Sequence, residues 1–273
     1  MSLPTITESP NPDSANIDRM SSLEIVRLIN QNDRVVASAV EAVLPAIAEA
    51  IDLIAEALRA GGRLFYVGAG TSGRLGVVDA AECPPTFGTE PDRVQALIAG
   101  GQRAMFLARE GEEDNAEQGG ADLLARGLAS GDVVVGLSTS GRTPYTRGAL
   151  EAARKVGAHT VAVICNPTGP IARHADVLIN PVTGPEVIMG STRMKAGTAQ
   201  KMVLNMLSTG AMVRIGRVSG NRMADMNVSC EKLRVRAARM ISMETGVSEE
   251  EAVRALDEAN GSVRGAIDTL RSR

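Results

Sequence analysis

The sequence predicts an α/β protein, in which a parallel sheet lies between two layers of helices and a small helical unit follows. Short β-branched runs alternate with helix-length connections through the middle of the chain, at residues 64–67, 94–98, 133–137, 160–164 and 177–179. These runs are almost continuously apolar, as expected of strands that are covered on both faces. Ligands of such sheets bind beyond the carboxyl ends of the strands, so we expect the functional residues in the loops there.

Helices are predicted before the first strand. Ser21, with Glu24 three residues later, has the capping-box pattern that begins a helix. Over residues 33–58 apolar side chains recur at steps of three and four, which predicts one long core-facing helix with a kink at Pro45. Residues 1–16 are rich in Pro, Ser, Thr and Asn and lack the apolar core of a signal peptide, so we expect a flexible N-terminal arm.

The C-terminal part of the chain is also predicted to be helical. An apolar segment over 194–215 is expected to pack on the sheet as a helix, although Gly197 and Gly210 weaken its helix propensity. Residues 227–273 are expected to form a separate small domain of three helices, which leaves 17–226 as the α/β domain with its N-terminal helices.

The spacing within this last segment resembles a ubiquitin-associated (UBA-like) fold. Gly246-Val247-Ser248 precedes one amphipathic segment, and Asn260-Gly261 precedes the next. We interpret the segment as a packing or dimer-supporting module, because such a fold need not bind ubiquitin. Recruitment of a protein partner is the alternative.

Composition and charge narrow the classes of function. The chain has 29 Lys and Arg against 32 Asp and Glu, a formal net charge of -3, which provides no broad attraction for nucleic acid or an anionic membrane. No uninterrupted apolar stretch reaches the roughly 18 residues of a membrane helix. Three widely spaced cysteines indicate neither a disulfide framework nor a zinc site. We therefore expect a cytoplasmic protein with no metal and no nucleic-acid or membrane partner.

Two loops of the predicted sheet carry the same tetrapeptide. Thr-Ser-Gly-Arg occurs at residues 71–74 and again at 139–142, each time after a strand. Glycines let several backbone N–H groups converge, hydroxyls add donors, and the N-terminus of the following helix favours negative charge. Either loop alone could be an ordinary strand-to-helix turn, but two matching loops predict a phosphate site.

A dinucleotide-binding site is the first rival interpretation of these loops. Gly68, Gly70 and Gly73 form the G-x-G-x-x-G pattern after a strand. That fingerprint also needs an acidic residue at the end of the next strand, to bind the ribose hydroxyls. Here the strand runs into Ala99-Gly100-Gly101 instead, which disfavours a nicotinamide cofactor.

The glycine- and hydroxyl-rich loop pair on a parallel sheet resembles the sugar isomerase (SIS) domain family, whose members bind phosphosugars at the strand ends. A narrower resemblance, to N-acetylmuramic acid 6-phosphate etherases, covers essentially the whole chain. Its motifs lie at residues 79–88, 99–101, 110–114 and 191–201. It implies a homodimer with the site near the subunit interface and a phosphosugar substrate.

Enzymes of this family split the ether between lactate and C3 of the sugar, giving N-acetylglucosamine 6-phosphate and lactate. The C1 aldehyde of the open-chain sugar acidifies the C2 proton, so one carboxylate can remove it while another carboxyl group protonates the departing lactate oxygen; water then adds. The resemblance implies that Glu82 is this acid and Glu113 is this base, with no cofactor. Ala81 departs from the family pattern, where Ser is expected, and could alter the surroundings of Glu82.

The resemblance also implies the binding residues. Hydroxyls of the two loops and nearby groups are expected to bind the phosphate, namely Thr71, Ser72, Ser138, Thr139, Ser140 and Thr143. Gly70, Arg193 and Lys195 are further candidates for substrate contact, with the two cations directed at anionic groups such as the carboxylate of lactate.

Each chemical role has a simpler structural alternative. Glu113 could belong to a solvated acidic turn, Glu82 to a helix surface, and Arg193 and Lys195 could be surface charges with buried stems. Cys83 as a nucleophile is disfavoured, because no histidine lies in its motif.

Two other functions remain open from the sequence. An amino-sugar-phosphate isomerase would share the abstraction of the C2 proton and differ only in releasing no lactate. A non-catalytic phosphosugar sensor would bind the same ligand without needing both glutamates.

Overall fold

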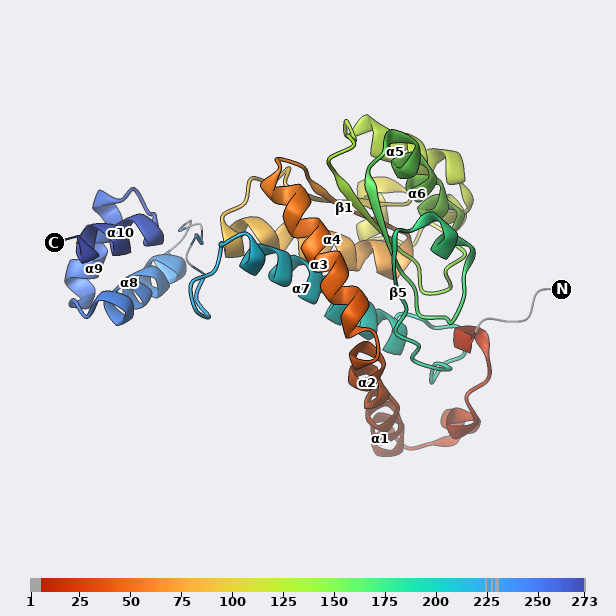
Figure 1. Cartoon of the computed structure of the whole chain (residues 1–273). Coiled ribbons are helices and arrows are strands. Elements are labelled where there is room, and N and C mark those ends of the chain that lie inside the picture. The colour runs from red at the N-terminus through yellow and green to blue at the C-terminus, as the bar shows by residue number, and fades with distance from the viewer. Residues whose placement is uncertain (1–5, 224, 227, 229–230, 273) are drawn as a thin grey trace.

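Five parallel strands form the centre of the protein, in the order β2-β1-β3-β4-β5 (Figure 1). The computed structural model describes residues 6–223, 225, 226, 228 and 231–272. The strands are β1 (Leu64–Gly68), β2 (Val94–Ile98), β3 (Val133–Leu137), β4 (His159–Val163) and β5 (Val177–Ile179). The predicted parallel sheet is confirmed, and each strand begins and ends within one residue of its predicted position.

Helices cover both faces of this sheet, as predicted. Neighbouring residues of β1 point to opposite faces, so Phe65 and Val67 belong to one apolar cluster whereas Leu64 and Tyr66 belong to the other. The helices of the two clusters are α5 (Ala116–Ala125) and α6 (Pro144–Val156) on one face, and α3 (Leu44–Arg59), α4 (Gly70–Phe87) and α7 (Lys195–Arg214) on the other.

Two short helices precede α3 and extend away from the sheet (Figure 1). α1 (Ser22–Asp33) begins at the predicted capping box, in which the backbone N–H of Ser21 donates to Glu24 Oε2 at 2.7 Å. The single kinked helix predicted over 33–58 is wrong, because the chain instead forms α2 (Val35–Glu41) and then α3. Pro45 lies in the first turn of α3, where its missing N–H would have no partner within the helix.

α7 is continuous despite its two glycines. A Cβ added at Gly210 would lie 2.5 Å from Cδ1 of Ile51 on α3, so the glycine allows the two helices to approach closely. The packing gained there offsets the weak helix propensity of glycine, which costs about 1 kcal/mol relative to alanine.

The N-terminal segment differs from the flexible arm that the sequence predicts. From Ile6 onward it forms three short 3-10 turns, η1 (Ile6–Glu8), η2 (Pro12–Ser14) and η3 (Ile17–Arg19). Thr7 is fully buried, and its carbonyl accepts a hydrogen bond from the N–H of Gly190 at 3.2 Å. Partners far along the chain therefore satisfy the polar groups of this segment. Residues 1–5 lie outside the described residues.

The C-terminal helices are α8 (Glu231–Thr245), α9 (Glu249–Glu258) and α10 (Val263–Arg271). They enclose an apolar cluster of their own, which includes Ile241, Leu256 and Val263, and they lie beyond the end of α7 in Figure 1. Asn227, at the predicted domain boundary, and Cys230 lie outside the described residues. Within the described ranges, no helix is both long and apolar enough to cross a membrane.

A buried carboxylate joins the beginnings of β1 and β3. Asp132 is only 2% exposed and accepts hydrogen bonds from the backbone N–H of Arg63 at 2.8 Å and from that of Ala129 at 2.8 Å. Nη2 of Arg63 adds an ion pair at 2.7 Å. Because Asp132 holds both strand starts, it stabilises their alignment.

We expect Asp132→Ala to lower the free energy of unfolding by about 3 kcal/mol, because it leaves several buried donors without a partner. Urea unfolding followed by circular dichroism measures the change. The control is Asp52→Ala, which removes the exposed pair between Asp52 and Arg214 and should cost less than about 1 kcal/mol. Equal losses in the two variants would contradict the role given to Asp132.

Candidate active site

A pocket of about 510 Å³ lies where β1 and β3 end. Since the two strands are parallel neighbours in the sheet, the loops that follow them meet at one edge. Both Thr-Ser-Gly-Arg loops contribute to it. The pocket is lined by Glu8, Ala69, Gly70, Thr71, Ser72, Glu113, Asp114, Ser138, Thr139, Ser140, Arg142, Thr143, Pro144, Gly190 and Thr192.

Hydrogen bonds among its own hydroxyls shape the loop after β3. Ser138 Oγ lies 2.8 Å from Thr143 Oγ1 and accepts from the N–H of Gly141 at 3.1 Å. Ser140 Oγ accepts from the N–H of Arg142 at 3.2 Å. α6 begins directly after this loop, at Pro144, so the positive end of its dipole lies at the pocket.

The loop after β1 leads directly into α4, which begins at Gly70. No side chain caps this helix start at Ala69, and Gly70, Thr71 and Ser72 of its first turn line the pocket. A helix N-terminus placed in this way favours an anionic group such as phosphate. Ser72 is almost buried and donates to Oε1 of Gln200 on α7 at 2.7 Å. All six hydroxyl residues predicted to bind phosphate therefore line one pocket.

Glu113 lies on the same pocket. It belongs to a short 3-10 turn, η5 (Glu112–Asp114), between β2 and α5, and its side chain is exposed. The neighbouring Glu112 forms an ion pair with Arg109 at 3.1 Å. Glu113 is thus brought to the phosphate loops by the connection after β2.

Glu82 is not brought to this pocket within one chain. It is exposed on α4, ten residues after Ser72, and an α-helix rises by about 1.5 Å per residue, so roughly 15 Å of helix separates the two. Among the described residues, Glu82 is absent from the pocket lining. Of the two predicted catalytic glutamates, the described structure therefore places Glu113, and not Glu82, on the lining of this pocket.

The two predicted cations do not line the pocket in the described part of the chain. Lys195 is 4% exposed, and its Nζ donates to Oδ1 of Asn32 at 3.5 Å. This placement does not support the predicted contact with substrate, because the ammonium group is enclosed beside α1. Arg193 is exposed and lies just before α7.

Sequence reasoning misses several pocket residues. Glu8 belongs to the N-terminal segment, which the sequence predicts to be flexible, and Gly190 lies in the connection between β5 and α7. Neither carries a local signal, because each reaches the pocket only through the folding of distant parts of the chain. Thr192 lies inside the 191–201 motif, and Arg142 ends the second tetrapeptide, so both could have been included.

The cysteines of the described part of the chain are buried thiols. Burial raises the pKa of Cys83 to about 12, and the nearby carboxylates of Asp79 and Glu82 act in the same direction. Burial likewise raises the pKa of Cys165 to about 12. Because the thiolate is the nucleophilic form, neither group is activated for attack.

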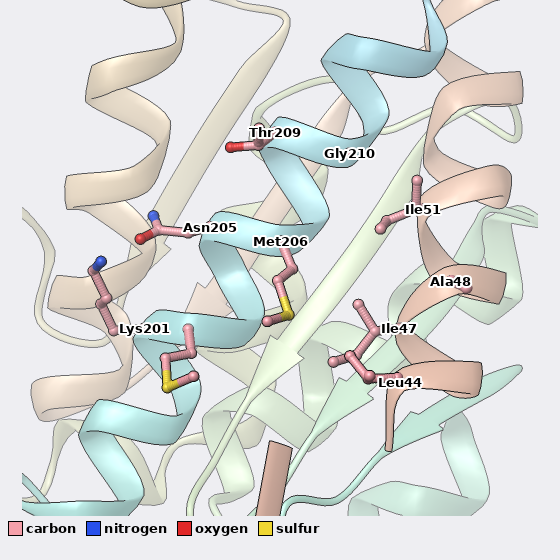
Figure 2. A pocket seen from close by; sticks show the side chains of 10 residues that line it. Leu44, Ile47, Ala48, Ile51, Lys201, Asn205, Met206, Thr209 and Gly210 are labelled. Carbon is pink, nitrogen blue, oxygen red and sulfur yellow. The ribbon is translucent and has the colours of Figure 1, made fainter. Parts of the chain in front are cut away.

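A second hollow, of about 620 Å³, lies between α3 and α7 (Figure 2). Most of its lining is aliphatic or methionine side chains, including Leu44, Ile51 and Met206, with Lys201 and Asn205 at one side. It lacks the converging hydroxyls and helix starts of the first pocket, so we place the chemistry in the smaller, polar pocket.

The five-stranded parallel sheet and its paired hydroxyl loops define a SIS-domain protein. Two family models match: the glucokinase regulatory protein N-terminal SIS domain over residues 46–154, and the SIS domain over 119–210. Solved structures show the same fold. A phosphoheptose isomerase from Francisella tularensis is similar with a TM-score of 0.50 and 16% identity, over 71% of this chain and 100% of that one. A protein of E. coli CFT073 has a TM-score of 0.53 and 17% identity, over 74% and 97%.

Curated relatives identify the family within this class. N-acetylmuramic acid 6-phosphate etherase of Symbiobacterium thermophilum is 63% identical, over 97% of this chain and 88% of the relative. That of Serratia proteamaculans is 55% identical, over 96% and 88%. The chain belongs to the N-acetylmuramic acid 6-phosphate etherase family, which confirms the resemblance seen in its motifs.

The raised pKa values of the two buried thiols predict how fast they react with a disulfide reagent. With a pKa of about 12, roughly one thiol in ten thousand is ionised at pH 8, so Cys83 and Cys165 should react very slowly with a disulfide reagent in the folded protein. The measurement is reagent uptake by Cys230→Ser, since Cys230 lies outside the described residues. Both thiols should react fast in denaturant, and fast native reaction of one equivalent would contradict this interpretation.

Proposed function

We propose that this protein cleaves the D-lactyl ether of N-acetylmuramic acid 6-phosphate, giving N-acetylglucosamine 6-phosphate and lactate. The observation that carries the proposal is near full-length identity of 63% to a curated etherase. The protein is accordingly a carbon-oxygen lyase, and its polar pocket suits a phosphosugar. Recycling or catabolism of cell-wall amino sugars would supply the substrate.

The phosphate group is assigned to the two loops at the ends of β1 and β3. Ser72, Ser138, Ser140 and Thr143 would donate hydroxyl hydrogen bonds, with Thr71, Thr139 and the backbone at Gly70 in support. The starts of α4 and α6 add favourable dipoles for the dianion. These contacts bind the substrate but take no part in breaking the ether bond.

The elimination is assigned to Glu113 and Glu82. Glu113, on the pocket wall, would take the C2 proton as the base. The electron pair left at C2 forms the double bond to C3, and the lactate oxygen leaves with a proton supplied by Glu82. Water then adds to the unsaturated aldehyde at C3 and restores the saturated sugar. This sequence uses two carboxyl groups in opposite protonation states and needs no metal or redox cofactor.

We further propose that the protein works as a homodimer and that Glu82 acts on the substrate bound to the other chain. Support comes from the separation of Glu82 from the pocket in one chain, and from the apolar hollow between α3 and α7, which a second copy could cover. Residues 227–273 would then serve as a small domain that supports the assembly. The buried free thiols Cys83 and Cys165 suit a reducing, cytoplasmic location.

An amino-sugar-phosphate isomerase is the second candidate. Its support is the similarity of the fold to a solved phosphoheptose isomerase. The isomerase would share the base at C2 but would form no lactate.

The first test is release of lactate from N-acetylmuramic acid 6-phosphate by the purified wild type. We expect release, and we expect Glu113→Gln and Glu82→Gln each to lower kcat by a factor between about 100 and about 10,000, because general acid-base groups contribute on that scale. Glu110→Gln, an exposed carboxylate near Glu113 that does not line the pocket in the described part of the chain, is the control and should retain most of the activity. Binding of the phosphosugar without lactate release would instead favour the isomerase or the sensor.

The second test is a purified mixed dimer, with a different affinity tag on each chain. A dimer of one Glu82→Gln chain and one Glu113→Gln chain has one site with both native glutamates if Glu82 acts across the interface, so about half of the wild-type activity should return. The control pairs a wild-type chain with a chain carrying both changes, which should be nearly inactive. The reverse result would place Glu82 in the site of its own chain.

A further inference from the structure

The N-terminal turn η1 (Ile6–Glu8) is tied to the phosphate pocket by one buried side chain. Asn166 is only 2% exposed. Its Oδ1 accepts a hydrogen bond from the backbone N–H of Ile6 at 2.8 Å, and its Nδ2 donates one to Oγ1 of Thr7 at 3.3 Å. The same Nδ2 donates to the carbonyl of Thr139, in the second phosphate loop, at 2.7 Å. Asn166 therefore holds η1 in a defined position relative to the loop that follows β3.

This anchoring places the carboxylate of Glu8 on the pocket. Glu8 directly follows the buried Thr7 and is part of the pocket lining. A Cβ added at Gly190 would lie 2.6 Å from Glu8 Oε2, so this glycine leaves the space that the carboxylate occupies. Gly190 also has a φ of +74°, which L side chains rarely adopt.

A carboxylate at this place can bind only certain chemical groups. It accepts hydrogen bonds and donates none when ionised, so it repels a phosphate dianion and attracts hydroxyl and amide N–H groups. The hydroxyl groups suited to binding phosphate belong to the two loops, whereas Glu8 comes from the N-terminal segment on another part of the pocket wall. The part of an amino-sugar phosphate that offers donors is its polyol and acetamido portion.

We propose that Glu8 is a specificity-determining residue of the sugar subsite, whose carboxylate accepts hydrogen bonds from hydroxyl or amide N–H groups of the bound sugar. The proposal rests on the proposed function in so far as the ligand is an amino-sugar phosphate. It gives η1 a role in selecting a phosphosugar over other phosphate compounds.

The test compares the dissociation constants of N-acetylglucosamine 6-phosphate and inorganic phosphate, measured by calorimetry on wild type and Glu8→Ala. Loss of a hydrogen bond to a charged group should weaken binding of the sugar phosphate by about 10- to 100-fold, and inorganic phosphate should bind as well as before or better. Glu8→Gln should weaken the sugar phosphate less, since it retains one acceptor oxygen. Asp13→Ala, an exposed carboxylate of the same segment that does not line the pocket, is the control and should change neither constant.

Three outcomes would overturn the proposal. An unchanged ratio of the two constants would show that Glu8 makes no contact with the sugar. Equal weakening of both ligands would assign Glu8 a structural role. A loss of about 100-fold or more in turnover, with unchanged affinity, would make Glu8 a proton carrier instead. The proposed function is judged separately, because a wild type that releases no lactate can still bind both ligands.

Discussion

The parallel pairing of β1 with β3 is the constraint on which the polar pocket depends. Gly68, at the end of β1, lies opposite Leu137, at the end of β3, so both strands finish at one level and their loops line one pocket. At the other end, Asp132 holds the starts of both strands through Arg63. A slip of one residue would turn each strand's side chains to the wrong face, so the buried clusters on both sides also hold this register.

Features encoded within a short stretch could be predicted from the sequence. The strands, the capping box at Ser21 and the six pocket hydroxyls follow from local patterns, because phosphate binding uses the backbone and side chains next to a strand end. Periodicity alone could not separate α2 from α3, since Pro45 suits a first turn as well as a kink. It also could not show that Gly210 packs against Ile51 and leaves α7 unbroken.

Features that depend on distant partners could not be predicted in this way. Polar composition indicates a loose N-terminal arm. Thr7 is nevertheless buried, and its polar groups form hydrogen bonds with Asn166 and Gly190, far along the chain. The motif places Lys195 at the substrate, but the fold encloses it beside Asn32. In both cases the residue type occurs in both exposed and buried positions, and only the tertiary structure shows which of these it occupies. Conversely, the glutamates are identified by motif, which carries no information about their separation in space.

α4 connects phosphate binding to the proposed proton transfer in one rigid element. Its first turn forms part of the pocket, while Glu82 lies almost three turns further on, and a sugar ring cannot span roughly 15 Å of helix. Under the proposed mechanism, Glu82 would therefore act on a different bound substrate from the one at its own helix start. A symmetric dimer satisfies this requirement with one interface, because the symmetry that brings one Glu82 to the partner's pocket also brings the partner's glutamate back. Phosphate binding would then be a property of one chain, and ether cleavage a property of two.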